Sequence, residues 1–173
     1  MDRELIQRLV ALEWEFFQAT RNEGGRAPCQ DDHETFWVMR TGQAMGWSEE
    51  MAAAWLSDLE AARTAGRNPV MELAHLLPPV EPEMEKLARA LAGQTVAWAE
   101  AAAQRYPYLC ASGRPIRSSA DSAAVTSLET YCYGELLTCR PETLRLFQRY
   151  YAEKARRGEN LYVEIQAHTA RLL

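Results

Sequence analysis

Apolar residues recur at helical spacing along most of the chain. Leu5, Leu9, Leu12 and Phe16 lie three or four positions apart, which predicts a first helix over about residues 3–21 with Asp2 as its N-cap. The same pattern predicts helices over about residues 31–44, 49–65, 69–77, 82–106, 127–139, 141–157 and 161–173. No segment alternates as a strand does. The pattern therefore predicts an all-α single domain, 1–173, built as a bundle of about seven or eight helices.

Short polar signals mark where several of these helices begin. Asp31 and Thr126 each stand three residues before a glutamate, the spacing of a capping box, and Ser48 and Asn160 precede two other helices. Two stretches contain the glycines and prolines that exclude regular structure, residues 22–30 and residues 107–125. We expect both stretches to be loops.

Charged and amide side chains fall on the apolar faces of three predicted helices. At about 100° per residue, Glu13 lies within the apolar stripe of the first helix, while Glu15 points to solvent. In the second helix Arg40 and Gln43 share the inward stripe with three apolar residues, Phe36, Met39 and Trp47. Asp32 lies one turn earlier on the same side of this helix. Glu135 is at the centre of a third such face, made with Leu128, Tyr131, Cys132 and Cys139.

These inward charges have two physical interpretations. A carboxylate removed from water without a partner costs several kcal/mol, so the groups must form ion pairs or line a wet cavity. In the first interpretation Glu13 and Glu135 pair with Arg40 in a buried network that only fixes helix register. In the second, a carboxylate with a raised pKa performs acid–base chemistry while an arginine holds an anionic substrate group. A third possibility is that the helical wheel misplaces the side chains.

The loop before the second helix carries a further set of candidate binding groups. Gly24 and Gly25 permit close backbone approach, Arg26 offers a bidentate fork, and Cys29 precedes a helix N-terminus, where thiolates are favoured. Two acidic residues already stand at that N-terminus and would repel an anion. A small, buried and inert role is the alternative for Cys29, as for many cysteines.

Composition and charge exclude several classes of function. The chain has 173 residues, with 19 Lys and Arg against 24 Asp and Glu, a formal charge of -5. Without a basic run, we expect no nucleic-acid partner. No apolar run approaches the roughly 20 residues that span a bilayer, and the acidic, amphipathic MDRELIQRLV is not a signal peptide. The four cysteines form no C-x-x-C pair, so we expect reduced thiols and a cytoplasmic location.

A metal site is weighed and not favoured. Glu72-x-x-His75 matches half of the di-metal pattern of four-helix bundles, and Glu164 with His168 could supply a second arm. That pattern needs two Glu-x-x-His motifs and two further glutamates, and the chain has one such motif. We therefore predict no metal and no cofactor.

Three runs of sequence resemble a known bacterial family. NEGGRAPCQDDHETFWVMR, GRPI at residues 113–116 and TSLETYCYGELLTC resemble the domain of unknown function four-one-two-five, over almost the whole chain. The resemblance implies one shared polar centre and, in some relatives, a neighbouring nucleotidyltransferase-like domain. It implies recurring roles for Glu13, Asn22, Glu23, Gly24, Gly25, Arg26, Cys29, Gln30, Asp31, Asp32, Arg40, Gln43, Gly113, Arg114, Pro115, Glu129 and Glu135. It implies no role for His33 or His75, which stand where aromatic residues are more usual.

Two hypotheses of function follow from these patterns. The first is an enzyme acting on a small polar, anionic metabolite, with Glu13 or Glu135 as general acid or base and Asp32 and Gln43 orienting the reacting groups. Its anion would be bound by Arg26, Arg40 and Arg114, with Cys29 in the same site. The second is a helical binding or regulatory module that docks on a partner enzyme or on a second copy of the chain, its inward charges serving only as core struts.

Overall fold

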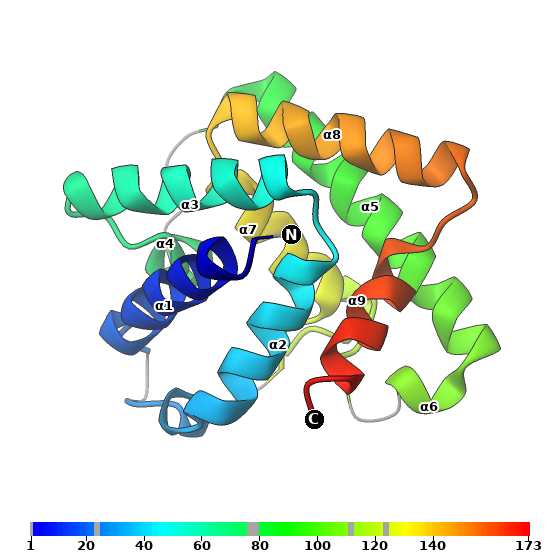
Figure 1. Ribbon diagram of the computed structural model, residues 1–173, viewed down its shortest axis with the longest axis horizontal. Helices are drawn as coiled ribbons and strands as arrows, with labels where there is room; N and C mark the ends of the chain where they lie inside the picture. The colour runs from blue at the N-terminus through cyan, green and yellow to red at the C-terminus, as the bar shows by residue number, and fades with distance from the viewer. Residues whose placement is uncertain (1, 23–24, 76–79, 111–112, 123–124) are drawn as a thin grey trace.

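A computed structural model of the chain describes residues 2–22, 25–75, 80–110, 113–122 and 125–173, with backbone only at 73–75 and 109–110. The described residues form helices and connecting turns, with no strand among them, so the predicted all-α fold is confirmed (Figure 1). The α-helices are α1 (Arg3–Ala19), α2 (His33–Met45), α3 (Glu49–Thr64), α4 (Pro69–His75), α5 (Pro82–Arg105), α6 (Pro107–Cys110), α7 (Leu128–Leu137), α8 (Pro141–Arg156) and α9 (Leu161–Ala170). Two 3-10 turns are η1 (Pro28–Asp31) and η2 (Ser118–Ala120).

Three predicted N-caps are confirmed by their hydrogen bonds. The side chains of Asp2, Ser48 and Asn160 accept the backbone N–H of the second or third helical residue of α1, α3 and α9. Each bond satisfies a donor that the first helical turn leaves without an intrahelical acceptor. These helices therefore begin where their sequence signals place them.

Two predicted N-caps are wrong by one residue. Asp32, not Asp31, caps α2, because η1 extends through Asp31 and leaves the next carboxylate facing the Thr35 N–H at 3.0 Å. Ser127, not Thr126, caps α7 and is fully buried. The predicted capping boxes at these two helix starts are thus not formed.

The stretch predicted to be irregular, residues 107–125, contains two short elements. α6 begins directly after α5, at a proline that suits the first helical position, and η2 adds one 3-10 turn. The rest of its described part is turn and extended chain. The prediction of a loop was therefore wrong for α6 and η2.

The helices pack around one apolar cluster to which α1, α3, α5, α7 and α8 each contribute. Figure 1 shows α7 near the middle of the molecule, with the other helices around it. α5 is the longest helix and packs against α7, while α2 packs against α1 on one side and α9 on another. This arrangement brings one face each of α1, α2 and α7 toward a shared interior.

The contact between α2 and α9 depends on a glycine. A Cβ added at Gly42 would lie 2.1 Å from Thr169 Oγ1 and 2.9 Å from the Thr169 backbone, closer than any side chain tolerates. Gly42 is itself buried, so the two helices approach through its missing side chain. This close approach holds α2 in place from the side opposite α1.

Across the described part of the chain, no helix is both long enough and apolar enough to cross a membrane.

Candidate functional site

Three helices bring ionised side chains to one point in the interior. Arg40 on α2 donates through Nε to Glu13 Oε2 on α1 at 2.8 Å, and through Nη2 to Glu13 Oε1. The same Nη2 lies 2.9 Å from Glu135 Oε1 on α7. The pairing of both inward carboxylates with Arg40, which the first interpretation predicts, is thus present. We call Glu13, Arg40, Gln43, Trp55 and Glu135 the buried centre.

Two uncharged side chains complete the hydrogen bonding of the buried centre. Gln43 accepts from Arg40 Nη1 at 2.8 Å and donates to Glu135 Oε2 at 3.2 Å. Trp55 on α3 donates its indole N–H to Glu13 Oε1 at 2.8 Å. Three of the four carboxylate oxygens therefore accept a hydrogen bond, and the fourth, Glu135 Oε1, forms the ion pair with Arg40. Trp55 is not among the residues singled out from the sequence, because the helical spacing of its neighbours gives no signal of this partner for its N–H.

Burial and charge set the electrostatics of this cluster. The side chains of Glu13, Arg40 and Glu135 are 7%, 11% and 19% exposed. Burial alone would lower the pKa of Arg40, but the charges of Glu13 and Glu135 outweigh it and hold that pKa well above its usual value. The guanidinium is therefore permanently charged. Two carboxylates share it, and the neutral donors of Gln43 and Trp55 help to stabilise the excess negative charge.

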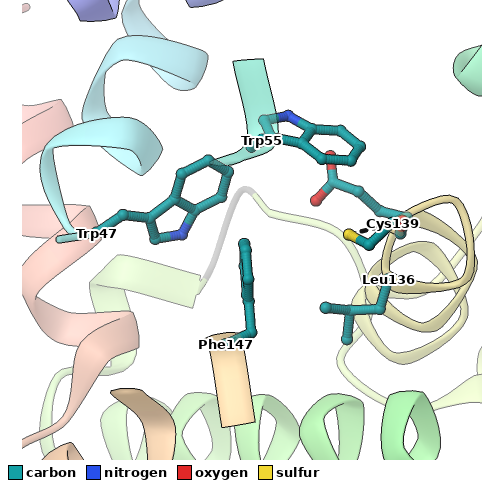
Figure 2. Close-up of a pocket in the computed structure, with 6 residues that line it drawn as sticks. Trp47, Trp55, Leu136, Cys139 and Phe147 are labelled. Carbon is teal, nitrogen blue, oxygen red and sulfur yellow. Dashed lines mark hydrogen bonds between the residues drawn. The ribbon is translucent and has the colours of Figure 1, made fainter. Parts of the chain in front are cut away.

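The space beside the buried centre is small. A cavity of about 10 Å³ lies next to Glu135, and the other residues around it are Trp47, Trp55, Leu136, Cys139 and Phe147. Figure 2 shows the three aromatic rings pointing toward this space, with Leu136 and Cys139 on its far side. A single water needs about 10–15 Å³, so the cavity holds at most one. Among the described residues, this cavity has no room for a metabolite.

Tyr131 lies within the electrostatic reach of the buried centre, and Arg114 lies over its ring. The Arg114 guanidinium lies 4.9 Å from the centroid of the Tyr131 ring and donates to the Thr126 carbonyl at 3.1 Å. Burial, reinforced by the charge of Glu135, raises the pKa of Tyr131 to about 12, so its phenol is neutral at physiological pH. Tyr131 was expected only as part of an apolar face, and its half-buried position beside two charged groups makes it a second residue missed from the sequence.

The predicted loop residues form a separate cluster at the end of α1. Arg26 donates to Asp31 Oδ1 at 2.8 Å, to Gln18 Oε1 at 2.6 Å and to the Gln30 carbonyl at 2.8 Å. Gln30 is 1% exposed and donates to the Phe17 and Thr20 carbonyls. These bonds brace the loop against α1. Glu23 and Gly24, two positions of the family resemblance, lie outside the described residues.

The structure thus divides the predicted site residues into two groups. Glu13, Arg40, Gln43 and Glu135 come together, and Arg114 reaches them through Tyr131. Arg26, Cys29 and Asp32 do not join them. Asp32 is exposed at the N-cap of α2, where the Thr35 N–H lowers its pKa. Cys29 is exposed rather than buried, and Met39, predicted to face inward, is 47% exposed.

A larger hollow lies on the outer face of α2. Its volume is about 400 Å³, and His33, Glu34, Trp37 and Val38, which we call the α2 surface, line it. The His33 ring lies edge-on to Trp14 at 4.8 Å between centroids and 5.9 Å from Trp37. This face was not predicted, although the spacing of His33 and Trp37, one helical turn apart, could have indicated it.

Potential metal ligands are scattered rather than clustered. In the part of the chain that the structure describes, no three His, Cys, Asp or Glu side chains lie close enough to hold a metal ion. Glu72 instead pairs with Arg67 at 2.6 Å, and Glu164 with Lys154 at 2.6 Å. The side chain of His75 lies outside the described residues. The absence of a metal stays a prediction.

Comparison with known families finds one match. The family described as Protein of unknown function (DUF4125) matches residues 3–173, essentially the whole chain. The chain therefore belongs to this family, as the whole-chain resemblance implied. No curated protein and no solved structure matches the chain significantly.

Proposed function

We propose that the chain is a helical binding module that docks on a partner protein through the α2 surface. One contrast supports this proposal: the hollow on the α2 surface measures about 400 Å³, whereas the space beside the buried centre measures about 10 Å³. Ligand-binding hollows commonly have about 300–1,000 Å³. Four neighbouring residues of a single helix line the larger one, a geometry that suits a side chain presented by a partner rather than an enclosed metabolite.

In this proposal the buried centre is a structural fastener. Its ion pairs join α2 to α1 and α7, the Trp55 hydrogen bond joins α3 to α1, and Gly42 lets α2 pack closely against α9. Trp14 of α1 adds an edge-on contact to His33. A helix held from several sides loses little conformational entropy when a partner binds, which favours recognition by a rigid surface.

A second candidate function is catalysis on a small anionic metabolite. The observation that favours it is the position of Arg114, which with Arg40 places two cations beside Tyr131. Substrate would reach the buried centre by displacing the Tyr131 ring. Glu135 or Glu13 would then act as general acid or base, and the two arginines would bind the anion.

The same proposal includes the cellular compartment of the chain and the class of its partner. A bacterial cytoplasm suits the free thiols of Cys29, Cys132 and Cys139, which a reducing compartment preserves. The formal charge of -5 disfavours nucleic acid as the partner.

The indole N–H groups of the five tryptophans distinguish the two candidates. Trp37 reports on the α2 surface and Trp55 on the buried centre, so a set of small fragments is titrated into ¹⁵N-labelled protein and both resonances are followed. Trp→Phe variants assign the peaks. We expect fragments to shift the Trp37 resonance and leave that of Trp55 in place. Shifts at Trp55 with an unchanged Trp37 would overturn the proposal and favour catalysis.

A further inference from the structure

The α2 surface combines aromatic faces with an unbalanced negative charge. Glu34 lines the hollow, and within the described residues its carboxylate has no hydrogen bond or ion pair. None of the four lining residues is a lysine or arginine. The Trp37 and His33 rings stand beside this carboxylate on consecutive turns of the helix.

The arginine of the loop that precedes α2 already has partners. Arg26 in the preceding loop bonds to Asp31, Gln18 and the Gln30 carbonyl, so its guanidinium is held against the loop. Asp32 adds a further negative charge at the start of the same helix. The charge around the α2 surface is therefore negative on balance, as is that of the whole chain at -5.

We infer that the α2 surface binds a cationic side chain, an arginine or lysine flanked by apolar residues, on a partner protein. This inference rests on the proposed function and names the chemistry of its partner. An indole face attracts a cation through its quadrupole, and a guanidinium can stack on Trp37 while it pairs with Glu34. Val38 offers apolar contact for the methylene stem of the same side chain. The net charge steers a basic segment toward the molecule.

Citrulline gives a test, because it has nearly the shape of arginine without the charge. The peptide acetyl-Gly-Leu-Arg-Leu-Gly-amide and its citrulline counterpart are titrated into the full-length ¹⁵N-labelled chain, and the Trp37 indole resonance is followed. A single exposed cation–π contact changes affinity by about two- to fivefold. We expect the arginine peptide to bind at least about threefold more tightly than the citrulline peptide.

Two variants assign that difference to residues. Glu34→Gln should reduce the preference for arginine to what the contact with Trp37 supplies, whereas Glu50→Gln should preserve it in full. Glu50 is the matched control, because it is also an exposed glutamate in the first turn of a helix. Trp37→Leu, followed through the backbone amide resonance of Val38, should bind both peptides more weakly, and its melting temperature checks that the fold is intact.

The outcomes separate this inference from the proposed function. Equal shifts of Trp37 by both peptides would overturn the cationic partner while leaving the α2 surface as a binding site. If neither peptide shifts the Trp37 resonance, whether or not other resonances move, the inference and the proposed function are both overturned. A Trp37 shift that grows with protein concentration alone would identify a second copy of the chain as the occupant and overturn the inference.

Discussion

Glu13→Gln is the substitution to which the buried centre should respond most clearly. The amide keeps the size of the carboxylate and can still accept the indole N–H of Trp55 through its oxygen. Its NH2 group, however, faces the guanidinium of Arg40. Both groups are hydrogen-bond donors, so the bidentate ion pair between Arg40 and Glu13 is lost. The substitution therefore removes charge pairing while it preserves shape.

The expected loss of stability depends on the burial of the ion pair and on the contact with Glu135 that Arg40 keeps. Breaking a buried ion pair costs roughly 3–5 kcal/mol. Glu135 still lies 2.9 Å from Arg40 and keeps its charge paired, so we expect the lower end, about 3 kcal/mol. In a domain of this size 1 kcal/mol moves the melting temperature by about 2–4 °C, which predicts a fall of roughly 6–12 °C. Glu135→Gln should cost less, about 1–2 kcal/mol, because that carboxylate is more exposed and makes one contact with Arg40.

Thermal and urea unfolding followed by circular dichroism measures these losses, with Glu15→Gln as the matched control. Glu15 is on the same helix, but its side chain is 63% exposed and lies 3.6 Å from Arg63. A surface pair of this kind is expected to change stability by less than about 0.5 kcal/mol. If Glu13→Gln had the same melting temperature as Glu15→Gln and the parent, the buried centre would not be a structural fastener. A strained catalytic carboxylate at Glu13 would then explain the result better.

Two further predictions test the packing and the thiols. Gly42→Ala should lower the free energy of unfolding by about 1–3 kcal/mol, because its Cβ would overlap the backbone of Thr169. Gly93→Ala, with open space around it, should raise that free energy by about 0.5–1 kcal/mol through helix propensity. Urea titration of both variants and the parent measures these changes. At pH 8 a disulfide reagent should modify the exposed Cys29 within minutes, while Cys132 reacts only on unfolding, because burial raises its pKa to about 12. Peptide mass spectrometry identifies the modified cysteine, and equal labelling of both in folded protein would contradict the burial of Cys132.

The pairing in the buried centre could be predicted because each member follows from helical geometry. An angle of about 100° per residue places Glu13 on an apolar stripe whatever the rest of the chain does, and the same holds for Arg40 and Glu135. Their mutual pairing then follows from the cost of an unpaired buried charge. The donor from Trp55 could not be predicted, because it depends on how α3 crosses α1.

The predictions that failed lie where helical geometry ends or does not decide burial. Asp32 was placed on the inward side by extending the wheel of α2 one residue before its first turn, but its backbone has φ -104° and ψ 75°, which is not helical. Met39 is at the edge of the apolar stripe of α2, and its side chain is 47% exposed because no neighbouring helix covers it fully. Arg26 is in a loop with no repeating pattern, so its bonds to Asp31 and Gln18 could not be read from spacing.

Hydrogen exchange of side-chain N–H groups tests most directly whether the buried centre is closed. Arg40 Nε–H and Trp55 Nε1–H both donate to Glu13, each at 2.8 Å. In ¹⁵N spectra, we expect both protons to exchange at least about a hundredfold more slowly than Arg26 Nε–H, because their exchange requires the core to open. Arg26 is the comparison, since it also donates to a carboxylate but its side chain is 47% exposed. Exchange of Arg40 Nε–H at the rate of Arg26 Nε–H would show that water reaches the buried centre, and would contradict a closed fastener.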